Sequence, residues 1–445
     1  MLKRTLVANR GEIACRILRA CKEAQVESVA IYADNDSGTL FTELADIAVK
    51  LQGEGLAETY LNQKQILDIA QQYGCDSIHP GFGFLSENAQ FAQAVMDAGL
   101  VWIGPSPFAI SQMGDKMTAR IAMKKAGVPV IPGEEVEGGL EEVLAVAPQV
   151  GFPLLLKATA GGGGKGMRAV HDPANLESEA KAAMREALNA FGDDRVYVER
   201  LLVGSRHIEI QVLADQHGRT IHLGERECSV QRRHQKVFEE SPSVALDWEL
   251  REEMGKAACA AAEAVDYVGA GTVEFLVTPK GEFFFLEMNT RIQVEHPVTE
   301  MVTGIDLIAE QLRIAGGEPI SVSQDQIELR GHAIECRINA EDATHNFRPA
   351  PGRITGWLPP GGPGVRVDSH VYTGYDIPPF YDSLIGKLIV WAPDREAAIS
   401  RMRRALNECA ITGIPTTVDF HLRMLERPEF LQGDIHTKFV EQEML

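Results

Sequence analysis

Residues 283–296 have the sequence FFFLEMNTRIQVEH, in which an apolar run leads directly into a cluster of charged and amide side chains. The apolar run predicts a β-strand that leaves a core, and a folding role alone does not explain the polar cluster at its end. Carboxylates and an Asn carbonyl suit a hard divalent cation, and an Arg side chain suits a small planar anion. The segment therefore predicts a metal-assisted reaction on anionic substrates.

The preceding residues predict that this strand belongs to a β-hairpin within 271–289, with its turn at Thr278-Pro279-Lys280-Gly281. A turn centred on Pro279-Lys280 places Glu274 opposite Phe285. Glu274 and Glu287 then become diagonal neighbours on one face of the sheet, within about 7–8 Å. A solvent-facing row of polar residues is the alternative, but phenylalanines share that face and imply that it is covered. We expect a site for divalent metal ions formed by Glu274, Glu287 and Asn289.

Bulk properties exclude several classes of protein. The chain has 445 residues, and a prior of roughly 100–200 residues per domain suggests about three domains. A net charge of −20 at pH 7 argues against nonspecific binding to nucleic acid or to an anionic membrane. No apolar stretch approaches the roughly 18 residues of a membrane span, and the N-terminal run is too short for a signal peptide. The seven scattered cysteines predict neither disulfides nor a zinc site and fit a reducing cytoplasm.

Three regions follow one another along the chain. Residues 1–113 alternate strand-like and helix-like runs, which predicts a Rossmann-like α/β domain with a parallel sheet. Residues 114–330 predict a larger α+β domain that contains a small lid at about 131–203. Strands dominate from there, and residues 331–445 predict a C-terminal α+β domain.

A run of four glycines, Gly161–Gly164, follows the strand-like segment that ends at Lys157. Successive backbone N–H groups in such a loop can point into one concavity and approach phosphate oxygens closely. We therefore favour a hairpin that covers a nucleotide over a flexible linker. It is not a P-loop, because no Ser or Thr follows Lys165. Lys116 and Lys157 both adjoin predicted strand or loop ends and could each hold a phosphate, with a solvated lysine as the alternative.

Three further polar segments have less specific patterns. Glu199 lies inside an apolar run, which predicts either a buried strand end that binds an amine or ribose, or a surface edge strand. Residues 207–212 alternate polar and apolar side chains, as a half-exposed strand does. Residues 225–236 predict a charged surface loop by default, and their concentration of basic side chains suggests a phosphate or carbonate site instead.

Taken together, the motifs closely resemble those of biotin carboxylase, an ATP-grasp enzyme of the biotin-dependent carboxylases. The resemblance runs through essentially the whole chain. It rests on Gly81–Asn88, the glycine loop, Gln231–Lys236, Glu287–Glu295 and Glu335–Asp342. It implies an ATP-grasp central domain with a mobile lid and a C-terminal biotin carboxylase domain. The implied reaction is the carboxylation of biotin with ATP and bicarbonate, through carboxyphosphate.

The resemblance also implies a role for each matching residue. ATP would contact Lys116, Lys157, Gly163, Gly164, Glu199, Leu202, His207, Gln231, His234 and Leu276. Mg²⁺ or Mn²⁺ would be bound by Glu274, Glu287 and Asn289. Bicarbonate would contact Lys236, Arg291, Gln293, the backbone of Val294, and Glu295, and biotin would lie near Phe82 and Arg337. The catalytic residues would be Glu295 as the base, Arg337 as the group that stabilises the biotin enolate, and Lys236 and Arg291.

Partners follow from the same resemblance. The chain has no Met-Lys-Met biotinylation motif, so we expect biotin to arrive on a separate biotin carboxyl carrier protein. Carboxyltransferase subunits would complete the system, as in the multi-subunit bacterial acetyl-CoA carboxylases. Arg19, Glu23 and Arg366 match positions at the family's homodimer contact, where Pro363 replaces an aromatic residue. Phe82 stands where many members have Tyr, so a hydroxyl is missing near biotin.

Other functions compete with this one. Another ATP-grasp ligase, related to carbamoyl phosphate synthesis or purine carboxylation, would share the metal carboxylates but need not have Arg337. A catalytically silent ATP-binding subunit would have no reason to keep the full set of catalytic side chains. A biotin carboxylase subunit of another acyl-CoA carboxylase fits the same residues, because the carboxyltransferase partner chooses the acceptor.

Overall fold

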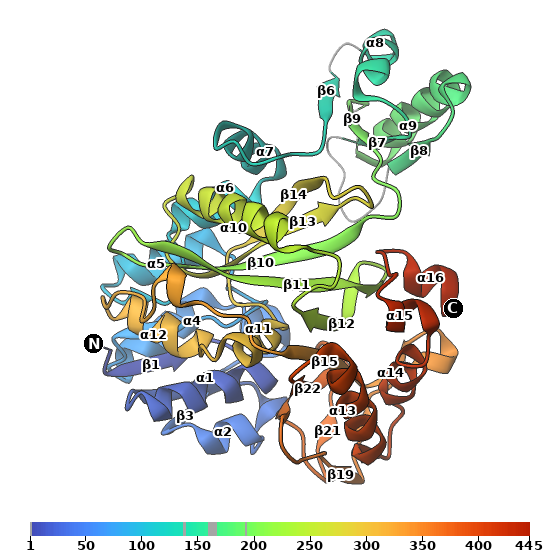
Figure 1. Cartoon of the computed structure of the whole chain (residues 1–445). Helices are drawn as coiled ribbons and strands as arrows, with labels where there is room; N and C mark the ends of the chain where they lie inside the picture. Colours follow the sequence, from blue (N-terminus) through green and yellow to red (C-terminus); the bar gives the residue numbers. More distant parts are fainter. Residues whose placement is uncertain (1, 137–138, 159–166, 192–193) are drawn as a thin grey trace. The chain divides into compact units, whose positions relative to one another are not determined.

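The computed structural model describes residues 2–136, 139–158, 167–191 and 194–445, and Figure 1 labels its helices and strands. The chain divides into two compact units. The larger comprises Met1–Val128, Arg206–Phe275 and Glu287–Leu445, and the smaller comprises Pro129–Ser205 and Leu276–Leu286. The predicted glycine loop lies outside the described residues. In the described part of the chain, no helix is both long enough and apolar enough to cross a membrane.

The N-terminal segment forms the parallel sheet that the sequence predicts. Its strands are β1 (Arg4–Val7), β2 (Glu27–Tyr32), β3 (Ile47–Lys50), β4 (Ser77–His79) and β5 (Val101–Trp102). They pair in the order β3-β2-β1-β4-β5, and every pairing is parallel. Its helices are η1 (Asp34–Asp36), α1 (Gly11–Glu23), α2 (Leu40–Leu44), α3 (Gly55–Glu58), α4 (Gln63–Gln72) and α5 (Ala89–Asp97). Helix α1 begins at Gly11 and buries Ile13, Ile17 and Leu18.

An eight-stranded sheet carries the three predicted metal ligands together with His207, Gln231, Lys236, Leu276 and Arg337. Its strands, in spatial order, are β14 (Phe283–Asn289), β13 (Gly269–Val277), β10 (Arg206–Ala214), β11 (Thr220–Arg232), β12 (Gln235–Ser241), β15 (His332–Asn339), β22 (Leu384–Ala392) and β20 (Val365–Ser369). Strand β12 pairs with β15 in antiparallel register, so the sheet continues from the central segment into the C-terminal one. Nearby in sequence are α6 (Pro107–Gly114), α7 (Lys116–Lys125), α10 (Trp248–Glu263), α11 (His296–Thr303), α12 (Leu307–Ala315) and η3 (Gln324–Gln326).

The smaller unit contains an antiparallel sheet of four strands. In spatial order they are β6 (Gly133–Val136), β9 (Val196–Arg200), β7 (Leu154–Ala158) and β8 (Met167–Val170). Helices α8 (Leu140–Val150), α9 (Leu176–Phe191) and η2 (Pro173–Asn175) complete this unit. Because β9 lies between β6 and β7, Glu199 is on an inner strand and not on an edge strand.

The C-terminal segment adds short strand pairs and helices around an apolar core that includes Phe238, Leu388 and Phe420. The pairs are β16 (Glu341–Asp342) with β17 (Arg348–Pro349), β18 (Gly352–Arg353) with β21 (Asp376–Ile377), and β19 (Gly356–Leu358) with β23 (Ala410–Thr412). The helices are α13 (Arg395–Glu408), α14 (Val418–Met424), α15 (Pro428–Gln432), α16 (Phe439–Glu443) and η4 (Ala343–His345).

Two local predictions are wrong. Residues 207–212 are not half exposed, since every residue of β10 from His207 onward is buried. Residues 225–232 are not a surface loop but the second half of β11, which is also buried. The reason is that β11 lies between β10 and β12 and also contacts α10 and α11, so neither its edges nor its faces meet solvent. Lys116 follows Asp115, the single residue between α6 and α7, so it lies at a loop end as predicted and begins α7.

Candidate active site

Lys236 on β12 is the centre of a buried cluster of carboxylates. Its ammonium nitrogen donates to Glu274 Oε1 at 2.7 Å, to Glu295 Oε1 at 2.7 Å and to Glu209 Oε2 at 2.5 Å. Burial alone would lower the pKa of Lys236, but the three carboxylates outweigh it and raise the pKa well above its ordinary value. The ammonium is therefore charged at neutral pH, and it joins β10, β13 and the loop before α11.

Glu295 is held from its other side by Arg337 on β15. An Arg337 Nη donates to Glu295 Oε2 at 2.9 Å, and its Nε donates to Glu239 Oε1 at 2.7 Å. Burial would raise the pKa of Glu295, but the charges of Lys236 and Arg337 lower it well below the ordinary range. Burial, with the charge of Glu295 adding to it, raises the pKa of Glu239 to about 7. These contacts keep the carboxylate of Glu295 ionised, whereas the pKa of Glu239 is about 7.

Glu274 contacts His207, which in turn contacts Gln231, and both are predicted ATP contacts. His207 Nε2 lies 2.8 Å from Glu274 Oε2, and His207 Nδ1 lies 2.8 Å from the side-chain nitrogen of Gln231. Because that amide nitrogen donates, Nδ1 accepts, and the proton of a neutral imidazole is on Nε2, facing Glu274. Burial would raise the pKa of Glu274, but Lys236 and His207 lower it well below the ordinary range.

The predicted metal ligands lie around the same carboxylate. Asn289 Nδ2 donates to Glu274 Oε1 at 2.8 Å, while Asn289 Oδ1 accepts from Arg291 at 2.7 Å. The pKa of Glu287 is raised, first by partial burial of its carboxyl and then by the negative charge of Glu274. Two carboxylates in electrostatic contact beside an amide oxygen suit Mg²⁺ or Mn²⁺. The residues therefore fit the predicted metal.

The hairpin that carries these residues has a different register from the predicted one. Its turn is centred on Pro279-Lys280 as expected, with the Gly281 N–H donating to the Thr278 carbonyl at 2.9 Å. The first rung, however, joins the Thr278 N–H to the Glu282 carbonyl at 2.8 Å, whereas the predicted register pairs Thr278 with Gly281. Gly281 has a φ of +82° and adds one residue to the loop, as in three-residue hairpins.

The predicted bicarbonate residues are held in place by further side chains. Arg291 donates to Glu87 Oε2 at 2.9 Å. Gln293 donates through its side-chain nitrogen to Glu274 Oε1 at 2.8 Å and accepts at its side-chain oxygen from Arg226 at 2.8 Å. The Gln293 amide is thus oriented from both ends.

Four of the residues in this cluster were not predicted: Glu87, Glu209, Arg226 and Glu239. Arg226 is fully buried and also donates to Glu209, to Gln211 at 2.7 Å, to Thr299 at 2.9 Å and to Thr272 at 3.0 Å. Glu87 belongs to the motif Gly81–Asn88, which is a local signal. For Glu209 the signal is strand register, since it lies opposite Arg226 in the pairing of β10 with β11.

The structure does not bring His234 to its predicted neighbours. His234 is exposed at the tip of the β11–β12 hairpin, where Arg233 and His234 have φ values of +49° and +66°. Gln231, in contrast, lies opposite Lys236 in that hairpin and is buried. Phe82 is partly buried, and its carbonyl accepts from Asn9 at 2.7 Å.

The remaining predicted nucleotide residues belong to the smaller unit. Glu199 is buried and forms an ion pair with Lys157 across the pairing of β9 with β7. Leu202 and Leu276 are half-buried. Gly163 and Gly164 lie outside the described residues.

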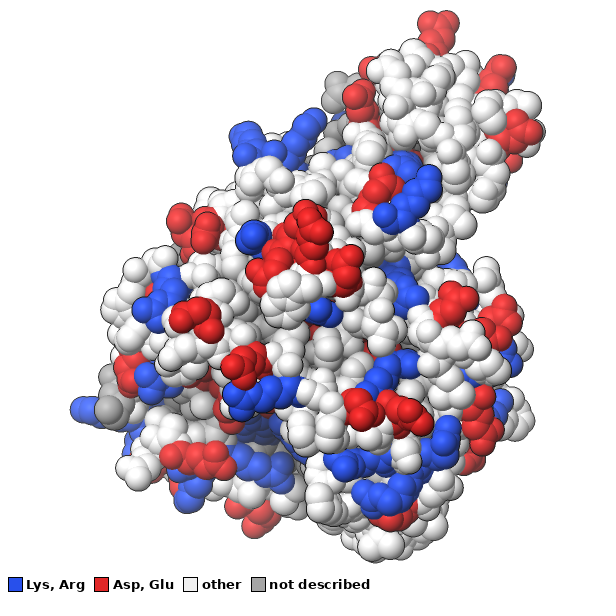
Figure 2. Space-filling view, viewed as in Figure 1, with Lys and Arg blue, Asp and Glu red and all other residues white. Residues whose placement is uncertain are grey.

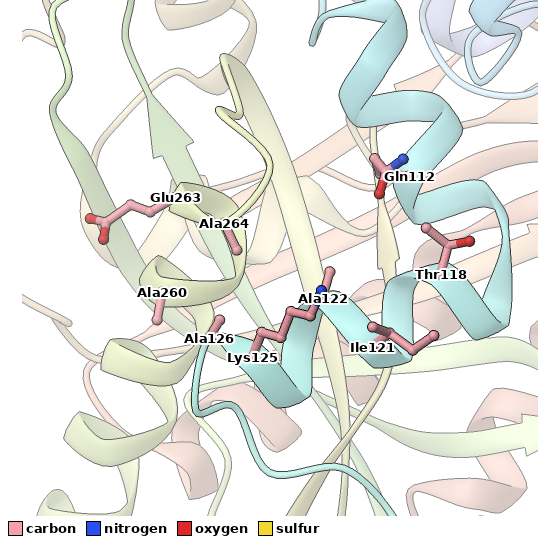
Figure 3. Close-up of a pocket in the computed structure, with 9 residues that line it drawn as sticks. All are labelled: Gln112, Thr118, Ile121, Ala122, Lys125, Ala126, Ala260, Glu263 and Ala264. Carbon is pink, nitrogen blue, oxygen red and sulfur yellow. The ribbon is translucent and has the colours of Figure 1, made fainter.

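A separate open pocket of about 600 Å³ lies in the larger unit. Figure 3 shows its lining side chains, which come from α6, α7, α10 and the residues that follow α7 and α10. Most are small or neutral, with Lys125 and Glu263 as the charged ones. None of the predicted site residues lines it. The concentration of buried, paired ionisable groups around Lys236 therefore marks the candidate active site better than this pocket does.

Comparison with known proteins identifies the family of the chain. Three family models match: "Biotin carboxylase, N-terminal domain" over residues 1–110, "Carbamoyl-phosphate synthase L chain, ATP binding domain" over 115–323, and "Biotin carboxylase C-terminal domain" over 335–442. A biotin carboxylase of Nostoc sp. is 58% identical over 441 residues, which are 98% of each chain. The chain belongs to the biotin carboxylase family. It is therefore an ATP-grasp enzyme that carboxylates biotin at the expense of ATP.

Two further relatives bear on substrates and partners. One subunit of the pyruvate carboxylase of Methanothermobacter thermautotrophicus is 52% identical over 99% of this chain and 90% of its own. The biotin carboxylase domain dimer of Hydrogenobacter thermophilus 2-oxoglutarate carboxylase was solved with MgADP, ADP and bicarbonate. It is 46% identical, with a TM-score of 0.91 over 99% of this chain and 98% of that one.

Proposed function

We propose that the cluster around Lys236 is the site where bicarbonate is activated by ATP and where its carboxyl group passes to biotin. The observation that carries this proposal is one chain of direct contacts. Lys236 donates to Glu295, and Glu295 accepts from Arg337. A cation for bicarbonate, a base and a cation for biotin are thus joined without an intervening residue.

In the proposed first step, Glu295 removes the proton of bicarbonate and so makes it a better nucleophile for the γ-phosphate of ATP. Lys236, Arg291 and the Gln293 amide orient the anion. Attack yields ADP and carboxyphosphate, and negative charge spreads over the transferred phosphoryl group.

The nucleotide side of the proposal uses two sets of residues. The phosphates are contacted by Lys116, Lys157, Gly163, Gly164, His207, Gln231 and His234, and the nucleoside by Glu199, Leu202 and Leu276. Glu274, Glu287 and Asn289 hold Mg²⁺ or Mn²⁺, which when bound supplies neutralisation of the phosphoryl charge. Lys236, Asn289 and Gln293 donate to one oxygen of Glu274, which would also be available to a bound cation.

On the biotin side, carboxyphosphate splits into CO₂ and phosphate, and the phosphate removes the N1 proton of biotin. Arg337 stabilises the resulting enolate oxygen. Glu239 supports this role, because its two contacts with the Arg337 guanidinium fix the direction of that side chain. Phe82 lies on the biotin side and offers a ring without a hydroxyl.

The proposed function also implies partner proteins for the enzyme. A biotin carboxyl carrier protein presents biotin, and its carboxylation is the first half-reaction of acetyl-CoA carboxylase. Carboxyltransferase subunits then pass the carboxyl group to acetyl-CoA, which leads to malonyl-CoA and fatty acids. The similarity to a pyruvate carboxylase subunit supports a second candidate function. In this candidate, the final acceptor of the carboxyl group is another acyl-CoA or an oxo acid. We also propose a homodimer formed through Arg19, Glu23 and Arg366. Arg19 and Glu23 are exposed on α1, while Arg366 already donates within the chain to Glu300 and Asp368.

The test is ADP release measured with bicarbonate and free biotin, added singly and together. We expect biotin to raise bicarbonate-dependent ADP release. No effect of biotin would contradict biotin carboxylation and favour another ATP-grasp ligase. No ADP release under any condition would favour a silent ATP-binding protein.

A further inference from the structure

Two consecutive carbonyl groups in the loop between β14 and α11 are each held by a buried side chain. The Gln293 carbonyl lies 2.7 Å from His296 Nδ1, which therefore donates. The Val294 carbonyl accepts from the ammonium of Lys387 at 2.9 Å. Since a peptide group is planar and trans, a fixed carbonyl also fixes the N–H of the following residue, which points the opposite way. The backbone on both sides of Val294 is thus oriented by these two contacts.

Lys387 reaches this loop from a distant part of the chain. It lies on β22 and is fully buried. Its ammonium lies 2.7 Å from Glu12 on α1 and 4.0 Å from Asp368 on β20. Burial alone would lower the pKa of Lys387, but Glu12, Glu335 and Asp368 outweigh it and raise the pKa, so the side chain is charged.

The ion pair alone does not account for the contact with Val294. A buried ammonium is costly unless it is paired and its remaining protons have acceptors. Glu12 supplies the counter-charge. The Lys387 ammonium also donates to the Val294 carbonyl. This carbonyl directly precedes Glu295, the proposed base, in a segment that we assign to bicarbonate. A displacement of this carbonyl moves both the Val294 backbone and the Glu295 side chain.

We propose that Lys387 is a positioning residue for the bicarbonate pocket, which together with His296 clamps the peptide groups on either side of Val294. This inference rests on the proposed function, because it assumes that the segment 291–295 binds bicarbonate. Lys387 itself touches no reacting atom. The competing explanation is purely structural: Lys387 and Glu12 form a buried ion pair that ties α1 to β22.

Two variants separate these explanations. Lys387→Met removes both the contact with Val294 and the counter-charge of Glu12, so we expect lower thermal stability and a weaker response to bicarbonate. In the double variant Glu12→Gln/Lys387→Met no unpaired carboxylate remains at position 12, so much of the stability should return. The Val294 carbonyl is still released in the double variant. Its bicarbonate defect should therefore persist.

The measurement is steady-state ADP formation with biotin present, titrated separately with bicarbonate and with ATP. For both variants we expect kcat/KM for bicarbonate to fall by about tenfold to a hundredfold, the size expected from a small misplacement of a reacting group. The KM for ATP should stay within about twofold. Recovery of both stability and bicarbonate response in the double variant would establish the structural explanation and overturn ours. Insolubility of both variants would also contradict it, since it assigns the Val294 contact a local effect.

The matched control is Arg4→Met in β1. Arg4 is likewise a cation that pairs with a glutamate, Glu27 at 2.5 Å, and donates to a backbone carbonyl, that of Tyr73. We expect lower stability with no change in the KM for bicarbonate. Wild-type enzyme without biotin-stimulated ADP release would refute the proposed function itself. An active wild type with an unaltered Lys387→Met variant would refute only the positioning role.

Discussion

At the scale of single residues, Glu295 meets two opposed demands. Lys236 and Arg337 hold its carboxylate and lower its pKa, which keeps it unprotonated but makes it a weak base. In the proposed mechanism, bicarbonate that binds beside Lys236 would take over part of that lysine's hydrogen bonding. The carboxylate then loses stabilisation and its affinity for a proton rises. The proposed base would therefore be stronger when its proposed substrate is bound.

This role predicts a specific defect for Glu295→Gln. The amide keeps the size of the side chain but cannot accept the bicarbonate proton, so we expect bicarbonate-dependent ADP formation to fall by about 10²–10⁴-fold. ATP affinity, measured by calorimetric titration, should change little because Glu295 is not among the proposed ATP contacts. Glu328→Gln, at an exposed pair with Arg330, is the control. Lost ATP affinity with intact turnover would disprove the assignment.

The contacts of the site were only partly predictable from the sequence. Lys236, Glu274, Glu295 and Arg337 lie in recognisable motifs, and the structure joins them through direct hydrogen bonds. Glu209 lies on another strand and depends on a register that shifts between Ile210 and Val212. Such a shift is decided by pairing across the sheet and leaves no local pattern in the sequence.

At the scale of elements, β11 shows why charge misled the prediction. Ionisable side chains are rarely buried unless they are paired, so a segment with the sequence ERECSVQRR predicts a surface loop. In β11 the partners come from other strands, from α10 and α11, and from the loop before α11. Arg226 finds acceptors on β10, β13, α11 and the loop before α11. The strand is buried because its charges are satisfied by residues far away in the sequence.

The same network predicts a large cost for Arg226→Met. Glu209 would lose one of its two cationic partners, and the oxygens of four other side chains would lose a donor. Breaking a buried pair in this way costs about 3–5 kcal/mol of unfolding free energy. Arg219→Met, in the turn of the same hairpin, is the matched control and should cost less than about 1 kcal/mol because Arg219 is exposed. Equal losses in urea unfolding would show that Arg226 is not the organising cation of β11.

At the scale of the whole molecule, ionisable side chains lie both on the surface and in the interior. On the face in Figure 2, acidic and basic side chains are interspersed, and acidic ones gather over α10. Inside, three histidines from separate elements are buried: His79 on β4, His370 after β20 and His421 on α14. Burial lowers the pKa of His79 to about 3, of His370 to about 3 and of His421 to about 4. All three are neutral at pH 7.

These histidines predict that the enzyme loses stability in mild acid. Unfolding returns each imidazole to an ordinary pKa near 6.5, so between about pH 4 and pH 6.5 the unfolded chain binds more protons than the folded one. Stability is therefore complete above pH 6.5 and falls as the pH is lowered, by up to about 1.4 kcal/mol per pH unit for each histidine. Urea unfolding at about pH 7, 6 and 5 measures how steeply the free energy of unfolding falls with pH.

The contribution of one histidine can be isolated at His370. Its ring lies edge-on to Tyr375 at 5.3 Å between centroids, so His370→Phe retains an aromatic ring in the same surroundings but has no proton to bind. We expect the loss of stability between pH 6.5 and pH 5 to become shallower by up to about 1.4 kcal/mol per pH unit. His171→Gln removes one exposed imidazole, is the matched control, and should leave the slope nearly unchanged. If His370→Phe keeps the full slope, the acid sensitivity arises from other groups.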